Sequence, residues 1–86
     1  MAEETLIELL KKLVNKKIRV TTTTGETYVA ILLHVDEEHR DVVHEILSTD
    51  RPERYEKMGT SVPGWYVTPF EYIAHVCEDD QDTSIR

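Results

Sequence analysis

The sequence predicts a mainly β fold in which an N-terminal helix precedes a strongly bent, five-stranded antiparallel barrel. Apolar residues first recur at helical spacing and then, after position 16, alternate with polar residues as they do in strands. Five β-prone runs follow with turn residues between them, and the second run is apolar on both faces. Because a chain of 86 residues can bury only one small core, we expect a single domain over residues 1–77.

The helix is expected over residues 5–14. Its apolar residues stand three or four positions apart and so share one face: Leu6, Leu9, Leu10, Leu13 and Val14. Thr5 and Glu8 have the spacing of a capping box, in which two side chains satisfy backbone N–H groups at the start of a helix. Asn15 can adopt the left-handed conformation that ends many helices. We therefore expect a short helix that lies on the barrel.

A β-hairpin is expected over residues 17–23 and 26–35. β-branched residues dominate the first strand, and Gly25 supplies the positive φ that a tight turn needs. The second strand carries apolar side chains on both faces, with Tyr28, Ala30 and Leu32 on one and Val29, Ile31, Leu33 and Val35 on the other. In so small a chain, such a strand must bend within a barrel or bury one face against another subunit.

Three further strands are expected over residues 41–48, 64–68 and 70–76. Pro69 separates the last two, because proline has no N–H for a sheet ladder. Residues 48–63 combine proline, glycine and charged residues without a sustained period, so we expect a long loop there. The acidic segment 78–86 is expected to be a disordered tail.

The chain carries a net charge of −7, from 17 acidic and 10 basic residues. This balance repels a phosphate backbone unless basic residues gather on one face, and half of them fall between Lys11 and Arg19. Cys77 is the only cysteine, which excludes an internal disulfide and suits a reducing compartment. The first residues resemble neither a secretory signal nor a membrane span, so we expect a cytoplasmic protein without a membrane partner.

Two stretches of the sequence resemble the motifs of the Sm and Sm-like (LSm) family, of which this chain would be a divergent member. The first motif spaces apolar residues around a glycine and an aspartate and continues into an apolar strand, which matches Gly25, Tyr28, Leu32, Val35, Asp36, Val42 and Val43. The second motif matches residues 66–73. The resemblance covers most of residues 6–76 and implies an SH3-like (Sm-like) barrel.

The chain departs from the family pattern at three places. Ala30 stands at the second glycine of the first motif, and Asp41 stands where the family usually has asparagine. Thr68 and Pro69 replace the Arg-Gly pair of the second motif. The family's asparagine and arginine normally help to hold a uridine base, so these departures bear on RNA binding.

The resemblance implies a homo-oligomeric ring of about five to seven subunits that binds single-stranded, U-rich RNA at its inner rim. Two neighbouring turns would build that rim from six candidate RNA-binding residues: Asp36, His39, Arg40, Asp41, Thr68 and Pro69. His39 or Arg40 would stack on a base, Arg40 would also contact a phosphate, and Asp41 would accept a hydrogen bond from a base edge. The alternative interpretation is that Asp36 caps its turn and that the other charged residues are solvated.

Two other functional classes fit the same pattern. One is an Sm-like scaffold that has lost the base pocket, and the other is a monomeric SH3-like barrel that binds peptides. His34, His39, His44 and His75 lack the close pairing of zinc ligands and are expected on strand surfaces, so we expect no metal and no other cofactor. No nucleophile motif or phosphate-binding glycine loop is present, and we therefore expect no enzyme activity.

Overall fold

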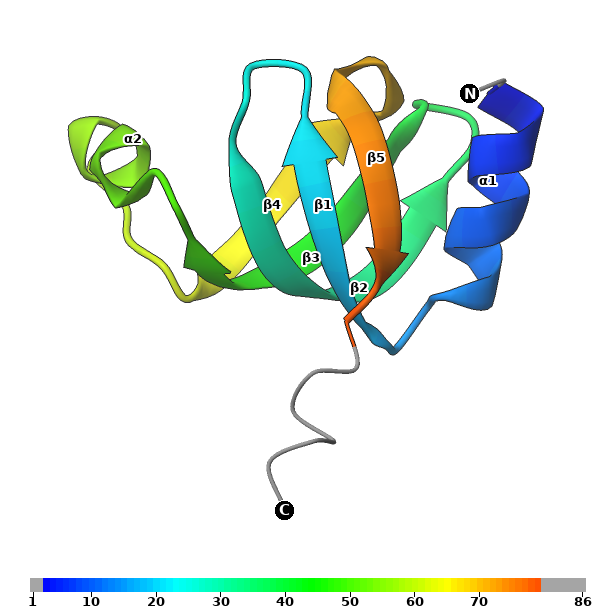
Figure 1. Cartoon of the computed structure of the whole chain (residues 1–86), viewed down its shortest axis with the longest axis horizontal. Coiled ribbons are helices and arrows are strands. Elements are labelled where there is room, and N and C mark those ends of the chain that lie inside the picture. The colour runs from blue at the N-terminus through cyan, green and yellow to red at the C-terminus, as the bar shows by residue number, and fades with distance from the viewer. Residues whose placement is uncertain (1–2, 80–86) are drawn as a thin grey trace.

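The computed structural model describes residues 3–79 and confirms the predicted fold class, an N-terminal helix followed by a bent, five-stranded antiparallel barrel (Figure 1). The strand order in the sheet is β4-β3-β2-β1-β5. The elements in chain order are α1 (Glu3–Lys12), β1 (Lys17–Thr22), β2 (Thr27–Asp36), β3 (Asp41–Thr49), α2 (Pro52–Lys57), β4 (Gly64–Pro69), the 3-10 turn η1 (Phe70–Tyr72) and β5 (Ile73–Glu78). None of the helices in this range is long and apolar enough to cross a membrane.

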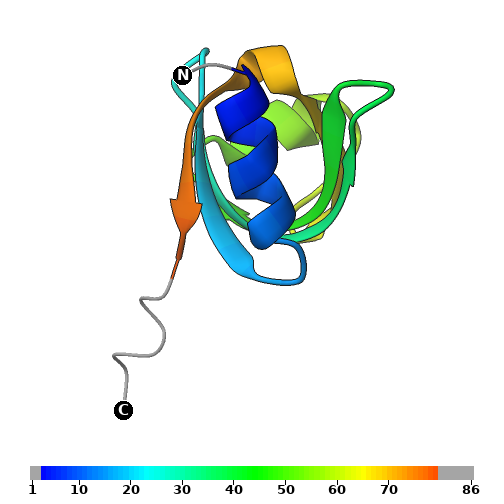
Figure 2. The same cartoon turned by 90° about the vertical axis from the view of Figure 1, so that its right-hand side faces the viewer.

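The core lies between the curled sheet and α1, which crosses one open side of the barrel (Figure 2). Leu6, Leu10 and Leu13 form the buried face of the helix and its C-terminal turn. Burial of each such leucine contributes roughly 2 kcal/mol to stability. The remaining buried apolar residues come mainly from the inner face of the sheet: Ile18, Val20, Tyr28, Ala30, Leu32, Val42, Ile46, Tyr55, Phe70 and Val76.

The helix α1 begins and ends two residues earlier than the predicted range 5–14. Thr5 therefore lies inside the helix, and the predicted capping box is wrong. Asn15 adopts a φ of 70°, which confirms the predicted left-handed stop. Its backbone N–H donates to the carbonyl of Leu32 (2.6 Å), and the Leu32 N–H donates to the carbonyl of Lys16 (3.1 Å). These two hydrogen bonds fix the end of α1 to the middle of β2.

The strand β2 is bent, as its sequence predicts. Its ladder with β3 shifts register at two points, between Val29 and Ala30 and between Leu32 and His34. Such bulges bend a strand and increase its twist. Tyr28, Ala30 and Leu32 on one face of β2 are buried, whereas the apolar residues predicted for the other face are only half-buried: Val29, Ile31, Leu33 and Val35. The prediction of two buried faces therefore holds for the inner face alone.

The segment 48–63 contains the helix α2, so the prediction of a loop is wrong for residues 52–57. Pro52 stands in the first turn, where its fixed φ and missing N–H are tolerated. Tyr55 is the buried residue of this helix, and its ring packs edge-on against Tyr66 with centroids 5.0 Å apart. A helix that buries one side chain has no apolar stripe, and hydrophobic periodicity could not reveal it.

The predicted fifth strand begins and ends later than residues 70–76. Pro69 is followed by the 3-10 turn η1, and β5 runs from Ile73 to Glu78. The backbone N–H of Asp79 donates to the carbonyl of Lys17 (2.8 Å), and its buried carboxylate lies 3.7 Å from Nη2 of Arg19. Residues 78–79 of the segment predicted as a disordered tail are therefore held against β1. Residues 80–86 lie outside the described range.

Candidate functional site

The six candidate RNA-binding residues come from two turns that the structure places side by side. Asp41 pairs with Asp36 across the β2–β3 turn and with Pro69 on β4. The backbone N–H of Phe70 donates to the carbonyl oxygen of Arg40 (2.9 Å), which ties the first turn to the junction between β4 and η1. The two turns therefore lie side by side, whereas their place at the rim of a ring and RNA binding there stay predictions.

Asp36 closes its own turn. Its Oδ1 accepts hydrogen bonds from the backbone N–H groups of Glu38 (3.1 Å) and His39 (3.0 Å), and its Oδ2 lies 2.7 Å from Nδ1 of His39. The backbone bond from His39, followed by the bond from its imidazole, lowers the pKa of Asp36. The same carboxylate raises the pKa of the His39 imidazole, which is 71% exposed. The alternative interpretation of Asp36 as a turn cap is confirmed.

The β2–β3 turn also contains a left-handed residue and an ion pair to α1. Arg40 adopts a φ of 60°, in the left-handed region that residues other than glycine rarely occupy. This conformation leads the chain directly into β3, where Asp41 is half-buried while Arg40 is exposed. An ion pair between Lys11 Nζ and Glu37 Oε2 (2.6 Å) joins the turn to α1. Both partners of that pair are about half exposed, so it contributes little to stability.

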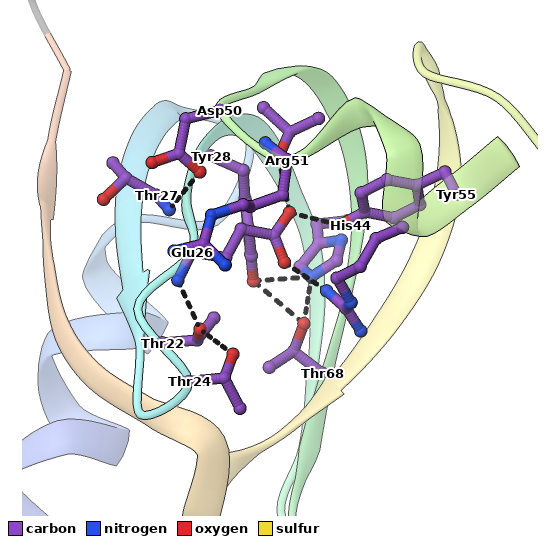
Figure 3. Close-up of polar contacts among 12 residues, drawn as sticks. Thr22, Thr24, Glu26, Thr27, Tyr28, His44, Asp50, Arg51, Tyr55 and Thr68 are labelled. Carbon is purple, nitrogen blue, oxygen red and sulfur yellow. Dashed lines mark hydrogen bonds and ion pairs between the residues drawn. The ribbon is translucent and has the colours of Figure 1, made fainter. Parts of the chain in front are cut away.

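The Thr68 hydroxyl is turned into the barrel and away from the rim. Thr68 pairs with Val42 in the ladder, but its Oγ1 lies 2.9 Å from the Tyr28 hydroxyl and 2.8 Å from Nε2 of His44 (Figure 3). The Tyr28 hydroxyl and His44 Nε2 are 3.0 Å apart. We call these three groups the inner triangle. The expectations that Thr68 faces the charged turn, and that His44 lies on a strand surface, are both wrong.

Burial determines how the inner triangle is protonated. It lowers the pKa of His44, so that the imidazole is neutral at pH 7, and it raises the pKa of Tyr28 to about 12. His44 Nδ1 is buried and finds no hydrogen-bond partner among the described residues. A proton on Nε2 would donate within the triangle but would leave one hydroxyl proton without an acceptor there, whereas a proton on Nδ1 would leave Nε2 to accept from a hydroxyl. The geometry fits both tautomers.

Glu26 is a fully buried carboxylate in the turn before β2. Its Oε2 accepts hydrogen bonds from Thr49 Oγ1 (2.5 Å) and from the Tyr55 hydroxyl (2.6 Å), and its Oε1 accepts one from Nη1 of Arg54. Burial, followed by the bond to Glu26, raises the pKa of Tyr55. Three donors from β3 and α2 thus satisfy one buried anion, and they fix α2 to the β1–β2 hairpin.

A cavity of about 540 Å³ opens beside Glu26 and the inner triangle. It lies between the β1–β2 turn, α2, β4 and η1. All four tyrosines of the chain line it: Tyr28, Tyr55, Tyr66 and Tyr72. Glu26 and Arg54 are its charged lining residues, and Ile46, Met58 and Val67 contribute apolar walls. The cavity therefore combines aromatic faces with a small number of buried polar groups, which is typical of small-molecule sites.

The sequence interpretation missed this polar interior, although the strand alternation contained a signal for part of it. Glu26 stands two positions before Tyr28, and His44 stands two positions before Ile46, in each case on an inward face. If the two-residue period of these strands is applied to polar residues as well as apolar ones, it predicts that both side chains point into the barrel. The donors on α2 gave no such signal, because their helix was not recognised.

Comparisons with known proteins support the fold. No protein-family model matches the chain, and no curated protein matches it. The crystal structure of a novel Sm-like archaeal protein from Pyrobaculum aerophilum is similar, with a TM-score of 0.61 and 21% sequence identity. The similarity covers 86% of this chain and 51% of that protein, so this chain spans about half of the length of the protein it resembles. At this identity the similarity establishes an Sm-like fold and nothing beyond the fold.

Proposed function

We propose that the chain is the subunit of a homo-oligomeric Sm-like ring, closed by pairing β4 of one subunit with β5 of the next. The observation that carries the proposal is the pair of sheet edges. Among the described residues, β4 pairs with β3 alone and β5 pairs with β1 alone. Each edge strand presents N–H and C=O groups, and a contact between unlike edges repeats from subunit to subunit until a ring closes.

Exposed apolar side chains on β4 support an interface there. Trp65 and Val67 are 73% and 55% exposed, and they share the outer face of the strand because they alternate with the less exposed Tyr66 and Thr68. A neighbouring subunit would remove the indole and the isopropyl group from water, which is favourable in proportion to the apolar area covered. On the other edge, residues 74–75 and 77–78 of β5 are exposed as well.

Static light scattering tests the ring. We expect a particle mass of about five to seven times the 10.0 kDa of the chain. Trp65 is the only tryptophan, so its emission should be blue-shifted in the ring and should move to the red when dilution dissociates the subunits. A monomeric mass at micromolar concentration would overturn the proposal.

A matched pair of variants locates the interface on β4. Trp65→Lys is expected to lower the particle mass, because it places a charge where the neighbour would pack. Met58→Lys introduces the same charge at an apolar residue that is 56% exposed but lies at the end of α2, and it should leave the mass unchanged. An equal effect of both substitutions would remove β4 from the interface.

A second candidate function is the binding of single-stranded RNA at the inner rim. It is favoured by the hydrogen bond between Phe70 and Arg40, which holds the exposed side of the β2–β3 turn next to the end of β4. A ring would repeat the guanidinium of Arg40 and the imidazole of His39 around its axis, and both groups can stack on bases. The carboxylates of the same turn oppose phosphate.

Fluorescence anisotropy with labelled oligo-U and oligo-A at low salt decides between an RNA-binding ring and a scaffold. RNA binding predicts an oligo-U affinity that falls with rising salt and falls further in Arg40→Ala, but not in the control Arg51→Ala beside α2. If a protein that forms rings fails to bind either oligonucleotide at tens of micromolar, the scaffold function is the correct one.

A further inference from the structure

We propose that the cavity between the β1–β2 turn, α2, β4 and η1 binds a small, uncharged, planar aromatic molecule that carries a hydrogen-bond acceptor such as a carbonyl group. Thr68 and Pro69 belong both to this cavity and to the candidate rim, and Val67 belongs both to the cavity and to the exposed face of β4, so the cavity adjoins those two surfaces. The proposal needs only a single subunit, because one chain supplies all the residues that line the cavity. The argument has three steps, which concern the walls of the cavity, its charge and its hydrogen-bonding groups.

The walls suit a flat aromatic body. A volume of about 540 Å³ falls within the range of several hundred Å³ that is usual for small-molecule sites. The four tyrosines that line the cavity offer both ring faces and ring edges, which aromatic ligands contact in offset or edge-on arrangements. Met58 and Tyr72 are large side chains at the cavity that are about half exposed, so the cavity has an apolar entrance.

The charges of the cavity are already balanced. Glu26 and Arg54 form an ion pair with each other, and the Glu26 carboxylate also accepts hydrogen bonds from Thr49 and Tyr55. An ionised ligand would lose its hydration on entering and would find no unbalanced charge of opposite sign. The cavity therefore selects an uncharged molecule over an anion or a cation of the same shape.

The inner triangle supplies a hydrogen-bond donor. The oxygens of Tyr28 and Thr68 and Nε2 of His44 lie 2.8–3.0 Å from one another, and each hydroxyl carries a proton that rotates between acceptors. Either hydroxyl can therefore turn its proton from a partner in the triangle to an acceptor in the cavity. Both side chains line the cavity. A ligand with a carbonyl oxygen or a ring nitrogen satisfies this donor, whereas a pure hydrocarbon does not.

Four probes of nearly equal size test the selectivity: benzamide, benzoate, benzylammonium and toluene. Each is titrated into the full chain with labelled methyl groups, and the NMR signals of Ile46 and Met58 report on the cavity. We expect benzamide to bind with a Kd on the order of a millimolar, as is usual for a fragment of about nine non-hydrogen atoms. Benzoate and benzylammonium should bind at least about tenfold more weakly because they must shed hydration without a counter-charge.

Variants test the donor and the walls separately. Tyr28→Phe is expected to weaken benzamide about fivefold to tenfold while leaving toluene unchanged, because it removes only a hydroxyl. Tyr72→Ala should weaken both probes, and His39→Ala at the rim should weaken neither. Where Tyr28→Phe fails to fold, Thr68→Val tests the same donor, and the order of the four probes on the wild type decides without any variant.

The proposal is overturned if benzamide does not saturate the cavity signals, or if benzoate or benzylammonium binds as tightly as benzamide. It is also overturned if Tyr28→Phe and Thr68→Val fold and bind benzamide as the wild type does. Light scattering of the same samples keeps this result apart from ring assembly. A monomer that binds benzamide would contradict the ring alone, and a ring that does not bind it would contradict the cavity alone.

Discussion

Replacement of Glu26 by glutamine is the sharpest test of the buried polar interior. The substitution keeps the size of the side chain but replaces a carboxylate, whose two oxygens both accept hydrogen bonds, with an amide that has one acceptor oxygen and one donor NH2 group. Hydrogen bonds from Thr49 and Tyr55 to a charged acceptor contribute about 1.5–3 kcal/mol each, against about 1 kcal/mol for a neutral acceptor. The ion pair with Arg54 adds about 0.5 kcal/mol after discounting for solvent, because the Arg54 side chain is 53% exposed. The expected loss of stability is therefore about 1.5–4.5 kcal/mol.

Urea denaturation followed by circular dichroism measures this loss, with the chain concentration held fixed because assembly shifts apparent stability. A single domain of this kind has a free energy of unfolding of about 5–15 kcal/mol, so Glu26→Gln should lower the midpoint strongly. Glu53→Gln, on the exposed surface of α2, is the matched control and should stay within about 0.5 kcal/mol of the wild type. A loss below about 1 kcal/mol for Glu26→Gln would refute the claim that the three donors depend on the carboxylate.

Three further outcomes are expected. Burial lowers the pKa of His44 in the folded chain, so below pH 6.5 the unfolded chain binds a proton that the folded chain does not. The stability that depends on a neutral His44 is fully present above pH 6.5 and is lost as the pH falls below that value. Unfolding midpoints of the wild type should therefore drop between pH 7 and pH 5. This drop should be smaller in His44→Gln. The carboxylate of Asp36 raises the pKa of His39, so the imidazole of His39 should titrate at lower pH in Asp36→Asn than in the wild type when both are followed by NMR; an unchanged midpoint would contradict the hydrogen bond between them. Gly25 has a φ of 95°, so Gly25→Ala should lower the free energy of unfolding, measured by urea denaturation, by about 1 kcal/mol or more. The cause would be backbone strain and not a steric clash, because a new Cβ meets Arg51 Nη2 at an ordinary contact distance of 3.4 Å.

The barrel could be predicted from the sequence because its signals are local and repeated. Alternation along β1 marked the residues that face the core, and Gly25 and Asn15 each marked a backbone conformation that the structure adopts. Pro69 correctly marked the end of β4. The continuation was wrong because a 3-10 turn of three residues has no sequence period of its own, and Phe70 reads equally well as the first residue of a strand.

The candidate site was harder to predict, because it depends on contacts between distant parts of the chain. The rim residues were placed by the resemblance to a known family, and the backbone bond between Phe70 and Arg40 agrees with that placement. The direction of the Thr68 side chain was wrong because it is decided by two partners, Tyr28 and His44, that lie 40 and 24 positions away. Glu26 was missed because charged residues are rarely fully buried unless several donors surround them, and those donors came from an unrecognised helix.

The edge strands β4 and β5, each paired on one side only within residues 3–79, have a consequence for the chain before it meets any partner. The unpaired N–H and C=O groups of a strand edge can form hydrogen bonds with another extended polypeptide, including an incorrectly aligned copy of the chain. A newly made subunit is therefore prone to aggregation. The net charge of −7 acts against this, since like-charged subunits repel one another at separations up to roughly 8 Å at physiological salt. The acidity that discourages contact with nucleic acid thus also keeps single subunits dispersed, and raising the salt concentration should speed both correct and incorrect association.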